Sequence, residues 1–107
     1  MEFDELREQI KVINLDNLRL DCDNHFEAVI SRSGLDKLIE RLERFFGSAV
    51  WPSKNRLSVK MQEAVNGFGG IMVGQTLYFR NDGNDIVFAM LWPWQDGQRT
   101  TLKIIKK

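Results

Sequence analysis

The sequence predicts an α+β fold, in which amphipathic helices pack on an antiparallel β-meander. Apolar residues recur at helical spacing in three segments of the first two thirds of the chain. The last third has short runs rich in β-branched and aromatic residues, separated by Asp-Gly pairs at 82–83 and 96–97 that are typical of two-residue turns. With 107 residues, of which 43% are hydrophobic and 28% charged, residues 1–107 are expected to form one domain.

A first helix is expected near the N-terminus, with Asn14 as its stop. Asp4 and Glu5 suit the positive N-terminal end of a helix dipole. The apolar positions fall three and four residues apart, so one stripe of this helix should be buried: Phe3, Leu6, Ile10 and Ile13.

Residues 18–30 are expected to add a strand or a hairpin to the sheet. Two runs of alternating apolar residues, Leu18–Cys22 and Phe26–Ile30, lie on either side of the polar pair Asp23-Asn24. A hairpin would pair the two runs across that polar break. A helix that begins at Asn24 is the competing interpretation.

Residues 33–47 form the clearest helical pattern in the chain. Ser33 and Asp36 have the spacing of a capping box, and Gly47 can adopt the left-handed conformation that ends a helix. Glu40 and Arg44 can pair one turn apart. Burial of each large apolar side chain contributes about 1.5–3 kcal/mol, so the apolar stripe must face a core: Leu35, Leu38, Ile39, Leu42, Phe45 and Phe46.

A further short helix is favoured for residues 57–66. The segment Met61–Ala64 has high helix propensity, and glycines follow it. The apolar positions that fit a helix are Leu57, Met61, Ala64, Val65 and Phe68. A strand is the alternative, because Leu57, Val59 and Met61 also alternate.

The final third is expected to form three antiparallel strands, near 72–80, 85–93 and 99–106. A turn at Asp82-Gly83 would place Phe79 opposite Ile86. A turn at Asp96-Gly97 would place Phe88 opposite Ile105 and Trp94 opposite Arg99.

Both faces of this meander are apolar. One face is expected to dock on the helix of residues 33–47: Leu77, Phe79, Ile86, Phe88, Met90, Trp92 and Ile105. The other face holds Tyr78, Val87, Ala89, Leu91, Leu102 and Ile104. An antiparallel sheet with one solvated side alternates apolar and polar residues, so the second face should also be covered. Another helix of the chain or a second copy could cover it, and a homodimer through this face or through a free sheet edge is the resulting hypothesis.

The charge of the chain gives no general attraction to nucleic acid or to membranes, because 15 basic and 15 acidic residues cancel. Residues 1–53 hold 11 acidic and 7 basic residues, and residues 54–107 hold 4 and 8, which can balance within one fold. A solvated rim is favoured over a nucleic-acid patch for the basic residues Lys54, Arg56, Lys60, Lys103, Lys106 and Lys107. No apolar segment approaches the length that spans a bilayer, and the single cysteine suits a reducing compartment, so a cytoplasmic location is expected.

The stretch from Asp21 to His25 has the residue types of a metal or catalytic site. A closed zinc site usually needs four ligands rich in cysteine and histidine, and the chain has one of each, so no metal is expected. A small enzyme that uses Cys22 as nucleophile and His25 as base, with a carboxylate, is an alternative function.

Aromatic residues in the segment Ala89–Thr101 suggest a binding surface. Trp92 has the parity of the core face, whereas Trp94 lies next to the turn, where Arg99 can stack on its ring. The sequence therefore predicts a small non-enzymatic binding or interaction module without a cofactor, which self-associates through its sheet or binds another protein. The candidate surface residues are Trp51, Tyr78, Trp94 and Arg99.

Overall fold

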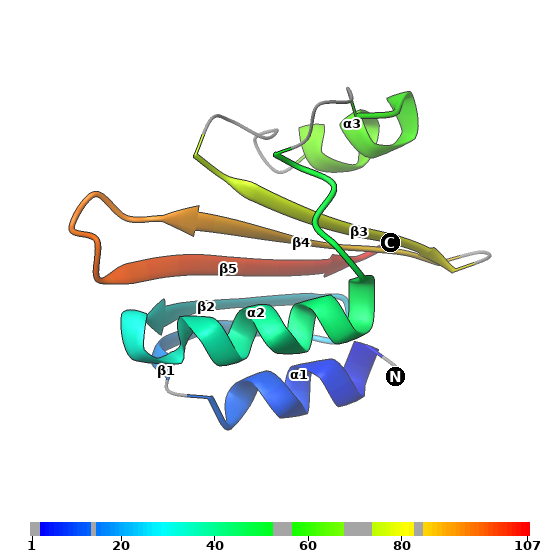
Figure 1. Cartoon of the computed structure of the whole chain (residues 1–107). Coiled ribbons are helices and arrows are strands. Elements are labelled where there is room, and N and C mark those ends of the chain that lie inside the picture. Colours follow the sequence, from blue (N-terminus) through cyan, green and yellow to red (C-terminus); the bar gives the residue numbers. More distant parts are fainter. Residues whose placement is uncertain (1–2, 14, 53–56, 68–73, 83–84) are drawn as a thin grey trace.

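The structure, a computed structural model, describes residues 3–13, 15–52, 57–67, 74–82 and 85–107. It has an α+β architecture with a five-stranded antiparallel sheet in the order β1-β2-β5-β4-β3. Helices α1 and α2 lie together on one side of the sheet and α3 on the other (Figure 1). The elements are α1 (Phe3–Lys11), β1 (Leu15–Asp21), β2 (His25–Ser31), α2 (Arg32–Phe46), α3 (Val59–Asn66), β3 (Thr76–Asp82), β4 (Asp85–Pro93) and β5 (Arg99–Lys106).

The hairpin predicted within residues 18–30 is present as β1 and β2. The backbone N–H of Cys22 donates to the carbonyl of His25 at 2.8 Å, so the chain reverses at Asp23-Asn24 as expected. The register of β1 against β2 shifts twice, between Leu15 and Asn17 and between Leu18 and Leu20. These irregularities twist an edge strand and make it a poor template for a further strand.

The meander has the predicted strands, with one correction to the register. Trp92 lies opposite Thr101 and Phe88 opposite Ile105, as a turn at Asp96-Gly97 requires. In the other hairpin, Asp82 lies opposite Asp85 and Phe79 opposite Phe88, so the predicted pairing of Phe79 with Ile86 is wrong by two residues. The first strand begins at Thr76 and continues to Asp82, and positions 72–73 of its predicted range lie outside the described residues.

The two faces of the sheet carry separate cores. The face that holds Tyr78, Ala89 and Ile104 packs with α1 and α2, and β2 adds Phe26, Ala28 and Ile30 to the same core. The opposite face packs with Ala64 and Val65 of α3 and contains Leu77, Phe88, Met90 and Ile105, with Phe79, Ile86 and Trp92 against them. Both faces are therefore covered by the chain itself over β3 and β4.

The predicted docking of α2 on the Leu77 face is therefore wrong. Helix α2 covers the other face, which was the face expected to need another helix or a second copy. It follows β2 directly at Arg32, and the apolar side chains of β2 lie on that same face. Helix α2 thus packs on the side of the sheet on which β2 presents Phe26, Ala28 and Ile30.

Helix α2 ends where the sequence predicts but begins earlier than predicted. Ser31 rather than Ser33 is the N-cap, and its side chain makes no capping hydrogen bond. Gly47 has a φ of +82°, and its N–H donates to the carbonyl of Glu43 at 2.9 Å, so it ends the helix as expected. Ser58 is the N-cap of α3, and its hydroxyl accepts from the N–H of Met61. Phe68 and the predicted stop at Asn14 lie outside the described residues.

A polar network ties α1 to the β1–β2 hairpin. Arg7 donates at 2.8 Å to Asp21 and at 2.8 Å to Asp4, and it also bonds the carbonyl of Cys22. The hydrogen bond from Lys11, followed by the charges of Lys11 and Arg7, lowers the pKa of Asp21 even though desolvation opposes this.

In the described part of the chain, no helix has the length and apolarity that crossing a bilayer requires.

Candidate functional site

The half of the sheet beyond α3 presents tryptophan and cationic side chains on the same face as the α3 core. Trp92 lies opposite Thr101 on β5, and Lys103 lies opposite Glu27 on β2. Trp94 follows β4, and its N–H donates to the carbonyl of Arg99 at 2.8 Å. Together with a residue of β1, these side chains form what we call the tryptophan face: Arg19, Trp92, Trp94, Arg99 and Lys103.

Cations lie over both indole rings of the tryptophan face. The Nζ atom of Lys103 is 4.1 Å from the ring centroid of Trp92. The guanidinium carbons of Arg99 and Arg19 are 5.4 and 5.9 Å from the ring centroid of Trp94. Such contacts hold long side chains flat against the rings, which pre-organises the surface.

The tryptophan rings complete the packing of this half of the sheet. The indole Nε1 of Trp94 donates to the Thr101 hydroxyl at 2.8 Å, and Thr101 lies opposite Val29, which is 1% exposed. The indole Nε1 of Trp92 is buried and has no acceptor among the described residues. One indole is therefore fixed by a hydrogen bond, and the other is held by packing and by Lys103.

Acidic groups balance the cations of the tryptophan face. Glu27 lies 3.8 Å from both Arg19 and Lys103, beyond hydrogen-bond distance. Arg99 bonds Asp16 and Asp96, each at 3.1 Å. Three cations and three carboxylates therefore share this surface, and their pairs are largely solvent-exposed or loose.

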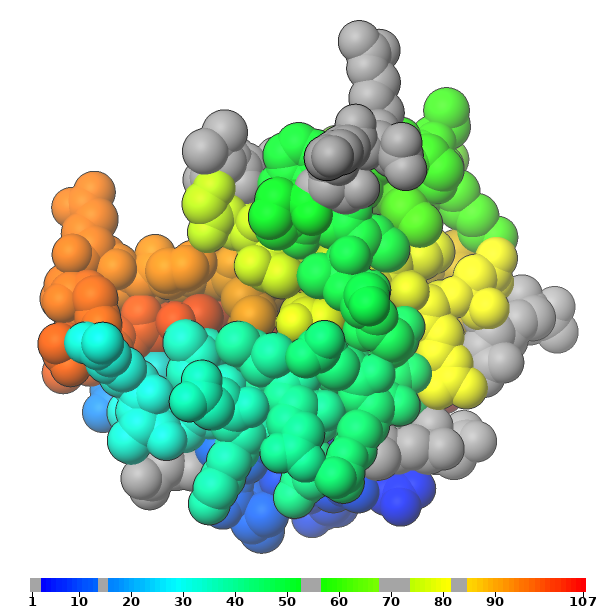
Figure 2. Space-filling view, in the orientation of Figure 1, coloured from blue at the N-terminus to red at the C-terminus, as the bar shows by residue number. Residues whose placement is uncertain are grey.

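A hollow of about 350 Å³ lies at the end of the sheet beside Trp94. The first turn of α2, cyan in Figure 2, approaches the orange β4–β5 hairpin, and the N–H of Arg32 donates to the carbonyl of Gln98 at 2.8 Å. The hollow is lined mainly by carbon atoms and aliphatic stems of both elements: Arg32, Leu35, Pro93, Trp94, Gly97, Gln98, Arg99 and Thr100.

The structure brings two of the four predicted surface residues together and separates the other two from them. Trp94 and Arg99 are in contact and both line the hollow. Trp51 is half-buried, pairs with Leu77 through a β-bridge and packs on the α3 core. Tyr78 is 4% exposed and lies in the core beneath α2, on the opposite face of the sheet.

The surface residues predicted from the sequence did not include Arg19 or Lys103. Lys103 has the same strand parity as Arg99 and Thr101, so its presence beside Trp92 follows from the predicted register of β5. Arg19 lies within the shift between Leu18 and Leu20, where parity gives no reliable indication of the face.

The alternative catalytic pair, Cys22 and His25, lies at the turn between β1 and β2. Cys22 and His25 flank the turn of the β1–β2 hairpin, and the Nε2 of His25 is 3.7 Å from a carboxylate oxygen of Glu27. Cys22 is exposed and does not line the hollow beside Trp94. Within the described ranges, no group of three or more histidine, cysteine or acidic residues has an arrangement that could hold a metal ion.

The predicted basic rim is dispersed. Lys60 is exposed on α3, Lys103 belongs to the tryptophan face, and Lys106 is 3.9 Å from Asp85. Lys54 and Arg56 lie outside the described residues.

Comparisons of the chain with protein-family models, with curated proteins and with solved structures find no match in any of the three. Function is therefore inferred from the side chains and their arrangement.

Proposed function

We propose that this protein is a small binding module and that the tryptophan face is the surface through which it associates with a second copy of itself. The observation that carries the proposal is the pair of tryptophan rings held under cations, with Trp92 at the margin of the α3 core and Trp94 beyond it. Tryptophan and arginine are the residues most enriched at the energetic centres of protein interfaces.

The charge balance of the surface favours a second copy over an anionic partner. A two-fold interface brings the same patch from each subunit together, so the patch must be complementary to itself. Three cations beside three carboxylates meet this condition, because the cations of one copy can face the carboxylates of the other. A nucleic acid would instead require an excess of positive charge on the surface.

The loose ion pairs of the surface can rearrange when a partner arrives. Among the described residues, Arg19 and Lys103 each lie 3.8 Å from a carboxylate oxygen of Glu27, and the Nε2 of His25 lies 3.7 Å from one. Exchanging such loose pairs for pairs across an interface costs little, because the Glu27 carboxylate lies 3.8 Å from Arg19 and from Lys103, beyond hydrogen-bond distance. The hollow beside Trp94 supplies a depression into which a side chain of the partner can insert.

The edges of the sheet are less suited to self-association than this face. On β3, the N–H and carbonyl of Leu77 already bond Trp51. On β1, two register shifts disrupt the regular ladder, and charged residues lie along the strand. These are the usual means by which edge strands avoid pairing with other chains.

We place the protein in the cytoplasm, where exposed Cys22 would remain a thiol.

Sedimentation equilibrium of the full chain tests the proposal. We expect a monomer–dimer equilibrium for the wild type. Trp94→Ala removes the anchor ring and should raise the dissociation constant at least about tenfold. Arg19→Glu should weaken association as well, since it reverses one charge of a self-complementary set without removing a buried group.

Val59→Ser is the matched control, because Val59 is 70% exposed on α3 and lies outside the tryptophan face. It should leave the dissociation constant unchanged. A wild type that is monomeric at high micromolar concentration would rule out self-association through this surface. An equal loss of association in Val59→Ser and Trp94→Ala would place the interface elsewhere.

A further inference from the structure

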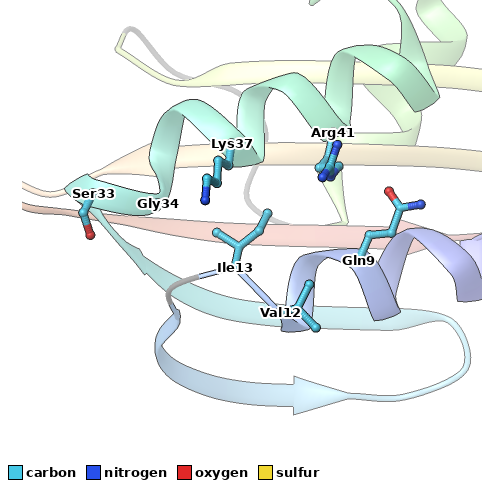
Figure 3. A pocket seen from close by; sticks show the side chains of 7 residues that line it. All are labelled: Gln9, Val12, Ile13, Ser33, Gly34, Lys37 and Arg41. Carbon is cyan, nitrogen blue, oxygen red and sulfur yellow. The ribbon is translucent and has the colours of Figure 1, made fainter.

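A groove of about 320 Å³ separates α1 from α2 on the side of the sheet opposite the tryptophan face. Figure 3 shows Lys37 and Arg41 on α2 and Gln9 rising from α1 toward α2, and all three side chains line the groove. None of the described residues that line the groove is acidic: Gln9, Val12, Ile13, Ser33, Gly34, Lys37 and Arg41.

The two cations of the groove are poorly neutralised. In the described part of the chain, no carboxylate lies within 4 Å of Lys37 Nζ. Arg41 is 3.6 Å from Glu40, but that same carboxylate oxygen is 2.8 Å from Arg44, which is its closer partner. Two positive charges one helical turn apart therefore face the same space without a matching anion.

Neutral groups add further positive potential. Ser33 and Gly34 belong to the first turn of α2, where the helix dipole is positive and no acidic residue opposes it. The Oε1 atom of Gln9 is buried and has no hydrogen-bond partner among the residues that the structure describes. Rotation of this amide by half a turn exchanges its oxygen for its NH₂ group and places a donor at the buried position.

We propose that the groove binds a phosphate monoester. Such a group carries about −1.5 to −2 charges at neutral pH and has three acceptor oxygens, which match two cations and the Gln9 amide. A carboxylate carries one negative charge and would neutralise only one of the two cations, Lys37 and Arg41. Val12, 87% exposed at the rim, gives the organic part of the ester an apolar contact. The site is independent of the tryptophan face and of the association proposed there.

NMR titration of the ¹⁵N-labelled full chain at constant ionic strength tests this proposal, with inorganic phosphate and phenyl phosphate as probes. We expect saturable shifts of the Ser33 and Gly34 amide signals with both, and tighter binding of phenyl phosphate. Lys37→Gln and Arg41→Gln should each raise the dissociation constant about tenfold, because each removes a charged hydrogen-bond donor. Val12→Ser should weaken binding of phenyl phosphate and leave binding of inorganic phosphate unchanged.

Lys60→Gln is the control, because it removes one positive charge from α3, where Lys60 is exposed on the side of the sheet opposite the groove. It should bind both probes as the wild type does. Absence of saturable shifts at Ser33 and Gly34 would overturn the proposal. An equal loss of affinity in Lys60→Gln and Lys37→Gln would also overturn it, since binding would then follow the general charge of the surface. Retention of phosphate binding by Trp94→Ala would separate this site from the tryptophan face.

Discussion

Tyr78 shows how the environment of one residue differs from what its type suggests. Its position on β3 is 4% exposed, and its ring centroid is 5.9 Å from that of Phe46 on α2. Burial, with a smaller contribution from the charge of Glu43, raises the pKa of the phenol above its usual value near 10. An aromatic residue with a polar tip was a reasonable candidate for a binding surface, but here it fills a core.

The folded protein is therefore expected to keep Tyr78 protonated above pH 10. Because the raised pKa belongs to the folded state, this group's contribution to stability is complete below the unfolded pKa and is lost as the pH rises through the folded pKa. Tyr78 is the only tyrosine, so near-ultraviolet tyrosinate absorbance reports it alone. In denaturant the transition should return to the ordinary value. A native transition at that ordinary value would show that Tyr78 is not buried under α2.

At the scale of elements, α2 determines which face of the sheet becomes the main core. Leu38 and Leu42 are completely buried, and the core that they enter includes Leu102 and Ile104 rather than Ile105. Glu40 and Arg44 pair on the helix at 2.8 Å, as the sequence predicts. The stripe and the pair follow from local spacing, whereas the face that receives the stripe does not.

Leu42→Ala should lower the free energy of unfolding by about 2–5 kcal/mol, the usual loss for deleting a fully buried leucine side chain. Denaturant unfolding measures that loss. The methyl NMR signals of Leu102 and Ile104 should shift in this variant, and those of Ile105 should change little. Larger changes at Ile105 would indicate that α2 lies on the α3 side of the sheet.

Sequence patterns predicted the strands and helices well because each pattern is local. The Asp96-Gly97 turn fixed the pairing of β4 with β5, including Trp94 opposite Arg99. The β3–β4 register was missed because a shift of two residues leaves every side chain on the same face, so periodicity does not distinguish the two registers. The face covered by α2 was missed because both faces of the meander are apolar.

The candidate site was only partly predictable for a related reason. Trp94 and Arg99 are neighbours across one turn, and turn chemistry brings them together. Arg19 reaches Trp94 from a strand some 75 positions earlier in the sequence, through an irregular register that no local rule describes. Non-local contacts of this kind depend on the whole sheet.

At the scale of the whole molecule, the sheet extends beyond α3 on the face that this helix covers. Helices α1 and α2 cover one face, while α3 packs on β3 and β4 on the other. The remaining half carries tryptophans and balanced charges, including Arg19 and Asp16 from the acidic first half of the chain and Arg99 and Lys103 from the basic second half. The charge separation in the sequence thus becomes charge pairing on one surface.

A dilution series followed by the indole N–H signals of the three tryptophans tests the role of this surface most directly. The signals of Trp92 and Trp94 should move with protein concentration, because both rings lie in the proposed interface. Trp51 is bridged to Leu77 of the edge strand β3, outside the tryptophan face, and serves as the internal control, so its signal should stay in place. Three signals that do not change with concentration, or a Trp51 signal that moves as far as that of Trp94, would contradict association through the tryptophan face.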